Sequence, residues 1–393
     1  MLALNCRKDL WIRMVKITAL VLPAVLLILL LPIGDNNLYC DTPRVRGYYM
    51  EEPDSLDVVI LGSSENFAGY SPVLAYEEYG FTSYPFVFMS NAFSIFDIQL
   101  EEALRVQSPQ MVLVDIGELI HVAERDEDRV FRWMVAGMPF SLHKIQLIHE
   151  YANPDEILEY YFPFISTHNT SSLKSVWDNW KGSYLIQKRG YTLLKGTDTD
   201  TGTGENLDGP YVTPRNTTGD YSTAELQPEV IRACQRVMDA CRRYPDIRFI
   251  FINTPHRINT EERYRNYQEI NAAGALLEEG GFAFINLESM TDEIGIDPKT
   301  DYYNRDHLNL YGQYKATRFL CDILTGEYGL KPRELSSENR EKWDTCVEYR
   351  YLHYQLFEEQ IKKRTPEGYG RSLHEDLWTL SKLEEMRQAN QIS

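Results

Sequence analysis

A chain of 393 residues with 43% hydrophobic content is long enough to bury one large core or two ordinary ones. Its 58 Asp and Glu against 40 Lys and Arg give a net charge of -18, which disfavours nucleic acid as a partner. The 26 tyrosines suit either core packing or a wet cleft that faces carbohydrate.

The first predicted element is an uncharged apolar run from Ile17 to Ile33, preceded by the basic residues Arg7, Lys8, Arg13 and Lys16. At ~1.5 Å per residue, such a run covers most of the ~30 Å hydrocarbon core of a bilayer. We expect a single-pass membrane anchor with a cytosolic N-terminus and an extracytoplasmic main domain. The alternative is a cleaved signal peptide, although no small-residue cleavage site follows Ile33.

Apolar runs and helical patterns alternate after a polar linker. Predicted strands cover residues 56–61, 84–90, 111–117, 247–253 and 282–287, and predicted helices cover 96–107, 227–244, 261–281 and 310–324. This alternation predicts an α/β fold, a three-layer sandwich around a mostly parallel five-stranded sheet. The expected domains are an N-terminus and anchor (1–34), a linker (35–55), the α/β domain (56–330) and a helical C-terminal extension (331–393).

A large insertion, residues 120–225, interrupts the rhythm of the α/β domain. It contains aromatic-rich stretches and a Gly/Thr-rich loop, and we weigh a lid over the sheet against a plain surface subdomain. In the C-terminal extension, an apolar stripe that includes Trp343 suits packing better than docking. Zinc or thioredoxin chemistry has no support, because no Cys-x-x-Cys pair occurs among Cys6, Cys40, Cys234, Cys241, Cys321 and Cys346. Cys234 and Cys241, seven positions apart on a predicted helix, are expected to pack.

Two segments carry the candidate chemistry. Gly62-Ser63-Ser64 follows the first predicted strand, where open parallel sheets bind their ligands. His307 lies in a polar turn after the last strand, and so at the same edge of the sheet. Taken singly, a Gly-Ser-Ser turn is more often a helix cap than a nucleophile, and a lone histidine is more often structural or exposed.

Taken together, these segments resemble the SGNH/GDSL hydrolase superfamily. The closest likeness is to its membrane-anchored, envelope-modifying branch, which includes the alginate O-acetylation and teichoic-acid D-alanylation proteins. "ILGSSENFAGYSP" resembles the nucleophile block and assigns the nucleophile to Ser64 rather than Ser63. "FMSNAFSIFDIQLEEAL" is similar to the second block, which assigns the oxyanion hole to Asn91 and its small neighbour Ala92. "FINTPHRIN" resembles the fourth-strand segment, and "DHLNLYG" resembles the terminal block with the base, His307.

The sequence departs from that pattern in two places. The family has an aspartate three residues before the histidine, where this chain has Asn304; Asp306 and Asp301 are near but out of step. An asparagine can still accept a hydrogen bond from the imidazole, but it stabilises the charged ring less well. The third block, Gly-x-Asn-Asp, is missing, and the chain reads "DIGELI" after the third strand. The resemblance thus leaves the oxyanion to Asn91 and the backbone N–H of Ser64.

Two functions follow from these patterns. The first is a serine esterase or O-acyltransferase of SGNH type that modifies a cell-envelope glycan through an acyl-enzyme, with acyl groups handed over by a multi-span membrane partner. No metal or other cofactor is expected, because the sequence has no clustered ligands. The second is a non-catalytic glycan-binding or assembly protein on a degraded hydrolase scaffold, which Asn304 and the missing third block favour.

Overall fold

The computed structural model describes residues 11, 13–23, 41–161, 173–202, 215–363 and 373–392. Residues 13–23 are helical, and the exposed side chains there include Ile17 and Leu20. Within these described ranges, no helix has both the length and the apolar character needed to cross a bilayer. Most of the expected anchor, from residue 24 to Ile33, lies outside the described residues.

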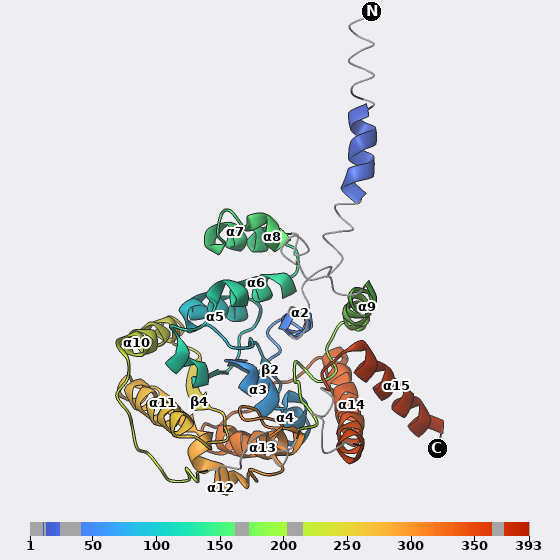
Figure 1. Cartoon of the computed structure of the whole chain (residues 1–393). Helices are drawn as coiled ribbons and strands as arrows, with labels where there is room; N and C mark the ends of the chain where they lie inside the picture. Colours follow the sequence, from blue (N-terminus) through green and yellow to red (C-terminus); the bar gives the residue numbers. More distant parts are fainter. Residues whose placement is uncertain are drawn as a thin grey trace, which may run out of the picture.

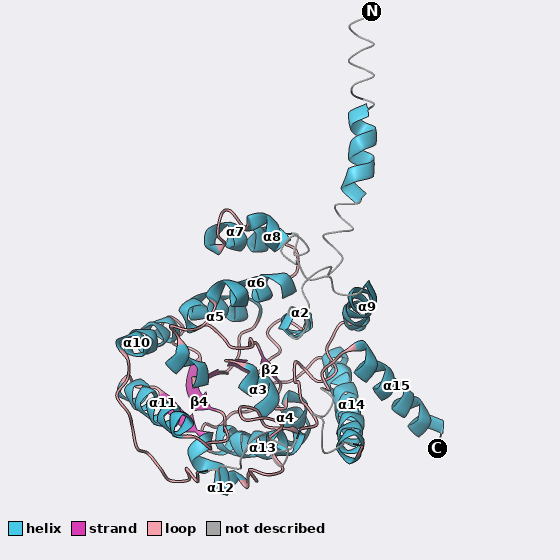
Figure 2. Cartoon of the chain, in the orientation of Figure 1, coloured by secondary structure: helices cyan, strands magenta, loops and turns pink. Residues whose placement is uncertain are grey.

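A five-stranded parallel sheet forms the centre of the molecule, and this confirms the predicted α/β class. The strand order is β2-β1-β3-β4-β5, which is a doubly wound arrangement. Every neighbouring pair is parallel. The strands are β1 (Val58–Leu61), β2 (Ser83–Pro85), β3 (Met111–Asp115), β4 (Arg248–Asn253) and β5 (Ala283–Asn286). Figure 2 shows the strands inside a surrounding layer of helices.

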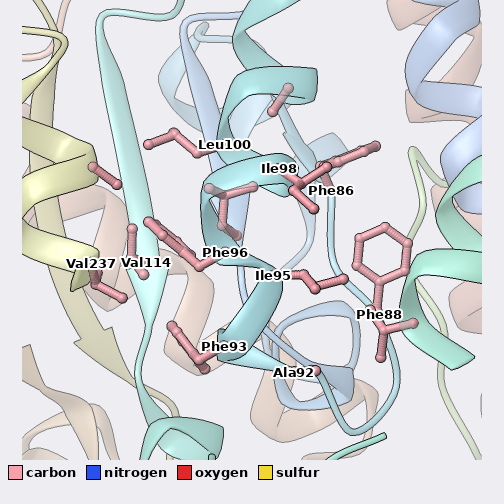
Figure 3. Packing of buried hydrophobic residues seen from close by; sticks show 14 of the residues in the cluster. Phe86, Phe88, Ala92, Phe93, Ile95, Phe96, Ile98, Leu100, Val114 and Val237 are labelled. Carbon is pink, nitrogen blue, oxygen red and sulfur yellow. The ribbon is translucent and has the colours of Figure 1, made fainter. Parts of the chain in front are cut away.

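Both faces of the sheet are covered, which explains why its central strands are continuously apolar. Val59 and Leu61 of β1 point into one core cluster, whereas Val58 and Ile60 point into the other. The first cluster is covered by α2 (Asp41–Met50), α5 (Phe96–Val106), α6 (Glu127–Gly137), α10 (Pro228–Arg242) and α11 (Glu261–Glu279). The second is covered by α3 (Ser64–Gly69), α4 (Pro72–Tyr79), α12 (Thr291–Ile294) and α13 (Leu310–Gly326). Figure 3 shows the packing of Phe96 and Leu100 of α5 near Val114 of β3 and Val237 of α10.

The expected linker instead contains helix α2, which is part of the core. Val45 and Tyr48 are buried in the first cluster, and the Tyr48 hydroxyl donates to the carbonyl of Ala103 at 2.7 Å. Two charged side chains of this polar segment are accommodated in the interior, because Arg44 forms a buried ion pair with Asp41. The second strand is also shorter than predicted, since regular pairing ends at Pro85.

The insertion adds α6, then α7 (Leu142–Tyr151), α8 (Ile157–Tyr161) and α9 (Leu173–Arg189). Helix α6 packs against α2, and its Met134 is fully buried. After α9, residues 192–202, here named the crossing segment, run through the interior of the protein. Within it, the fully buried Lys195 forms an ion pair with Glu51 at 2.7 Å.

The C-terminal extension packs onto the α/β domain. Helix α14 (Ser337–Lys362) contacts α4, and α15 (Leu377–Ile392) contacts α14 and α9; Figure 1 shows α14 and α15 together beside the sheet domain. Trp343 of the predicted stripe is fully buried, while Tyr351 of the same helix is half exposed. A third apolar cluster joins Leu356 and Phe357 of α14 to Leu74 of α4 and to Leu194 of the crossing segment.

Candidate active site

The nucleophile candidate lies where β1 turns sharply into α3. Ser63 is the N-cap of α3: its hydroxyl accepts from the backbone N–H of Glu65 at 3.4 Å, and its own N–H donates to Asn66 Oδ1 at 3.0 Å. This reciprocal capping uses Ser63 for structure and leaves Ser64 as the first helical residue. A residue in that position has no partner for its N–H within the helix, so this N–H can serve a ligand.

The turn after β1 requires glycine at position 62, because neighbouring atoms leave no room for a side chain there. A Cβ atom there would lie 2.0 Å from Asn66 Oδ1 and 2.8 Å from the Cβ of Asp115. Asn66 also donates to Asp115 Oδ2 at 2.9 Å and to the Thr254 hydroxyl at 3.2 Å. The turn after β1 is therefore tied to the carboxyl ends of β3 and β4.

His307 reaches the same edge of the sheet on a short turn closed by the bridge between Tyr302 and Leu308. Asn304 Oδ1 accepts from the backbone N–H groups of Asp306 and His307, at 2.8 and 2.9 Å, so this atom must be the carbonyl oxygen. His307 Nδ1 lies 2.9 Å from the same oxygen and must carry the proton. Nε2 is then free to accept, and it lies 2.7 Å from Ser64 Oγ although the two residues are 243 positions apart.

The structure pairs both candidate carboxylates with basic residues other than His307. Asp306 forms an ion pair with Arg263 of α11. Asp301 accepts from Lys315 Nζ at 2.7 Å and is buried. Among the described contacts of the ring nitrogens of His307, the partner of Nδ1 is the neutral Asn304.

Asn91, the expected oxyanion donor, is engaged elsewhere. Its Nδ2 donates to Gln99 Oε1 at 3.1 Å, and its Oδ1 accepts from Gln99 Nε2 at 2.6 Å and from the N–H of Ala92 at 2.9 Å. The structure does not bring its amide into the cavity beside Ser64. The residue of this loop that lines the cavity is Ser90, whose φ of 47° is in the left-handed region.

Ser64 and His307 open into a cavity of about 430 Å³. Most of its lining is charged or polar and comes from the ends of β3, β4 and β5 and from α11; it includes Glu65, Glu118, His121, Arg125, His256, Thr260, Glu262, Arg263, Asn266, Glu288, Arg305 and Asp306. Of the expected insertion, Ile120, His121 and Arg125 contribute, all close to its start. The remainder of the insertion does not appear among the lining residues that the structure describes, so the idea of a lid gains no support.

A charge network that the sequence did not reveal forms part of the cavity wall. His256 Nε2 is 3.0 Å from Glu65 Oε1, and His256 Nδ1 is 3.3 Å from Glu288 Oε1. Burial acts to lower the pKa of His256, but the two carboxylates raise it well above the usual value, so the ring is protonated. Burial would raise the pKa of Glu65, but the ion pair with His256, together with smaller effects of His307 and the Ser63 hydroxyl, more than offsets this, and the pKa of Glu65 is lowered.

The charge of Glu65 acts on its neighbours. Burial together with this charge raises the pKa of Glu118 to about 7 and that of Asp115 to about 6. Burial lowers the pKa of His307, and the carboxylates of Glu65 and Asp306 oppose that effect. His307 is therefore neutral near pH 7 and able to act as a base.

The crossing segment and Tyr303 hold the histidine turn in place. The ring of Tyr303 stacks on the imidazole of His307, with centroids 5.3 Å apart and planes within 8°. A Cβ atom on Gly202 would lie 2.3 Å from the carbonyl oxygen of Tyr303, so glycine permits this close approach. Asn309 donates to the carbonyl of Gly202 at 3.0 Å and caps α13.

Comparison with known proteins yields only distant structural likeness. No protein-family model matches the chain, and no curated protein matches it. Among solved structures, a lipase/acylhydrolase from Enterococcus faecalis aligns over 71% of this chain and 100% of its own, at 11% identity and a TM-score of 0.31. At that TM-score the likeness is too low to support a functional argument.

Proposed function

We propose that the protein is a serine acyl hydrolase or acyltransferase. The observation that carries the proposal is the 2.7 Å approach of His307 Nε2 to Ser64 Oγ, with the tautomer fixed by Asn304 so that Nε2 accepts. A hydroxyl beside a neutral, oriented imidazole, at the mouth of a cavity, is the arrangement that activates a serine for attack on an acyl group.

The proposed reaction has two steps. Ser64 Oγ attacks the carbonyl carbon of an ester while its proton passes to His307 Nε2, and the ring then gives that proton to the departing alcohol. Water or a sugar hydroxyl next attacks the acyl-enzyme, its proton passes to His307, and Ser64 leaves with that proton. Base catalysis of this kind contributes ~10²–10⁴-fold, and one oxyanion donor, here the N–H of Ser64, contributes ~10²–10³-fold.

We propose a hydroxyl-rich, glycan acceptor rather than a lipid. The support is the cavity lining, which is dominated by charged and polar side chains such as Glu118, Arg125 and Asn266. A long acyl chain would leave these groups without water or partners, which is costly. A small acyl group on a polar polymer leaves them solvated or hydrogen-bonded to the ligand.

We further propose that the protein is anchored in the cell membrane and modifies an envelope polymer outside it, with a multi-span membrane acyltransferase as its partner. The support is the apolar run from Ile17 to Ile33 with its basic flank. A reporter fused to the C-terminus tests this placement. If the reporter is active only in the cytosol, the envelope substrate is excluded.

The test of the reaction compares wild type with two adjacent serine variants. We expect a fluorophosphonate probe to label wild type and Ser63→Ala but not Ser64→Ala, and we expect His307→Ala to slow labelling by ~10²–10⁴-fold. The same ranking is expected for hydrolysis of an aryl acetate. Ser63→Ala is the matched control, because it removes the neighbouring hydroxyl, and the loss of this helix cap costs about 0.5–2 kcal/mol.

The competing function is a non-catalytic glycan-binding or assembly protein. It is favoured by the pairing of the Asn91 amide with Gln99 and by the neutral partner of His307. Equal, background labelling of wild type and Ser64→Ala, together with binding of an acetylated glycan by both, would establish this reading and exclude the enzyme.

A further inference from the structure

The imidazole of His307 has no carboxylate on its Nδ1, yet a base that becomes charged during the reaction needs compensating negative charge. Glu65 directly follows the nucleophile and lies in the same cavity as His307. Glu65 is 7% exposed. Its Oε1 is paired with His256, whereas its Oε2 has no hydrogen-bond partner among the described residues. A buried carboxylate with one unpaired oxygen at a reactive centre calls for an explanation.

The surroundings of Glu65 are arranged to keep it charged and in place. A Cβ atom on Gly117 would lie 2.5 Å from Glu65 Oε2, so the glycine makes room for the carboxylate. Glu288, which holds His256, is itself held by Asn253 Nδ2 at 2.9 Å. With both carboxylates ionised and the histidine protonated, the Glu65–His256–Glu288 group carries one net negative charge in the cavity that His307 also lines.

On this basis, and resting on the proposed function, we propose that Glu65 is a positioning residue that supplies to His307 the negative charge that an aspartate at position 304 would otherwise supply. The proton still moves between Ser64 Oγ and His307 Nε2, and Glu65 exchanges none. Its charge stabilises the imidazolium that exists while the ester carbonyl is being attacked. The carboxylate thus acts from the nucleophile side of the ring rather than through Nδ1.

Other charges also face His307 and set the background for a test. Besides Glu65, the charged groups that act on His307 directly are Asp306 on its own turn, His256 after β4 and Arg263 on α11. The other charged or titratable residues that line the cavity are Glu118 and His121 of η3 (Gly117–His121), Arg125 just after it, Glu262, Glu288 and Arg305. Asp306 is about half exposed and paired with Arg263, so solvent and the guanidinium screen it. Asp306→Asn is therefore the matched control for removing a carboxylate near His307.

The first readout does not depend on turnover. We would titrate the His307 imidazole by NMR, assigned by comparison with His307→Gln, in full-length wild type, Glu65→Gln and Asp306→Asn. We expect Glu65→Gln to lower the pKa of His307 by roughly one unit or more, and Asp306→Asn to lower it by much less. Equal shifts in the two variants, or no shift in Glu65→Gln, would overturn the proposal even if the protein proves to be inactive.

The second readout is a double-mutant cycle on aryl acetate hydrolysis with Asn304→Asp. Introducing an aspartate at position 304 should raise kcat less than about threefold in wild type but at least about tenfold in Glu65→Gln, because only that variant lacks the Glu65 carboxylate near His307. The acid limb of kcat/KM should move to lower pH in Glu65→Gln while the plateau falls. If Glu65→Gln does not fold, a gain of a hundredfold from Asn304→Asp alone would still refute the proposal, and a gain below threefold would support it.

Discussion

Replacing Gly62 with alanine tests whether the turn after β1 positions the nucleophile. The added Cβ would lie 2.0 Å from Asn66 Oδ1, against the 3.4 Å at which ordinary contact begins, and 2.8 Å from the Cβ of Asp115. Asn66 would have to withdraw and give up its contacts with Ser63, Asp115 and Thr254. At about 0.5–1.5 kcal/mol for each of these three hydrogen bonds, the free energy of unfolding should fall by about 1.5–4.5 kcal/mol.

The same displacement should affect reactivity, because a shift of about 1 Å at a reacting atom can cost ~10²-fold in rate. We would measure the fluorophosphonate labelling rate and the urea denaturation curve of Gly62→Ala under conditions where the variant is folded. Gly326→Ala at the end of α13 is the control, since no atom lies within 4 Å of the added methyl. If Gly62→Ala matches Gly326→Ala in both measurements, the turn does not position Ser64 as described.

Three further predictions concern protonation and stability. The kcat/KM for an aryl ester should rise with pH and reach half its maximum below pH 6.5, because burial lowers the pKa of His307 and the neutral ring persists to lower pH; a midpoint above pH 7 would contradict this. Glu51→Gln should lower the free energy of unfolding by about 3–5 kcal/mol, because it leaves the ammonium of Lys195 buried without its partner. Adding Lys195→Met should recover part of this loss. Urea denaturation measures both changes, and a loss below about 1 kcal/mol in Glu51→Gln would show that the ion pair is dispensable. In a variant with Cys6 and Cys40 replaced by serine, a thiol reagent should react only after unfolding, because burial raises the pKa of each remaining thiol. The remaining thiols are those of Cys234, Cys241, Cys321 and Cys346. Fast labelling of the native protein would contradict this prediction.

The sheet was predictable because its strands are buried on both faces and therefore read as unbroken apolar runs. Helix α2 was not predicted, because its segment is polar and contains proline, and the charges of Asp41 and Arg44 are paired only in the folded chain. The second strand was predicted too long, since residues beyond Pro85 are buried without forming regular pairs.

The site shows the same division between local and long-range signals. Ser64 and His307 could be proposed from the turns that carry them, and the geometry brings them together. Asn91 was assigned from its place in a motif, but the direction of its amide depends on Gln99, eight positions away. The role of Glu65 depends on its ion pair with His256, and the two residues come together only because β1 and β4 lie in the same sheet. No local sequence pattern predicts this ion pair.

The crossing segment links parts of the chain that a domain map would treat as separate. Asp198 donates its N–H to the carbonyl of Phe67 in α3, and Thr199 accepts from Leu373 at 2.8 Å just before α15. The carbonyl of Gly202 accepts from Asn309, two positions beyond His307. The crossing segment therefore contacts the Ser64 helix, the His307 turn and the segment before α15. Truncation of the chain before α14 should then disturb the position of Ser64, although Ser64 lies on a different helix.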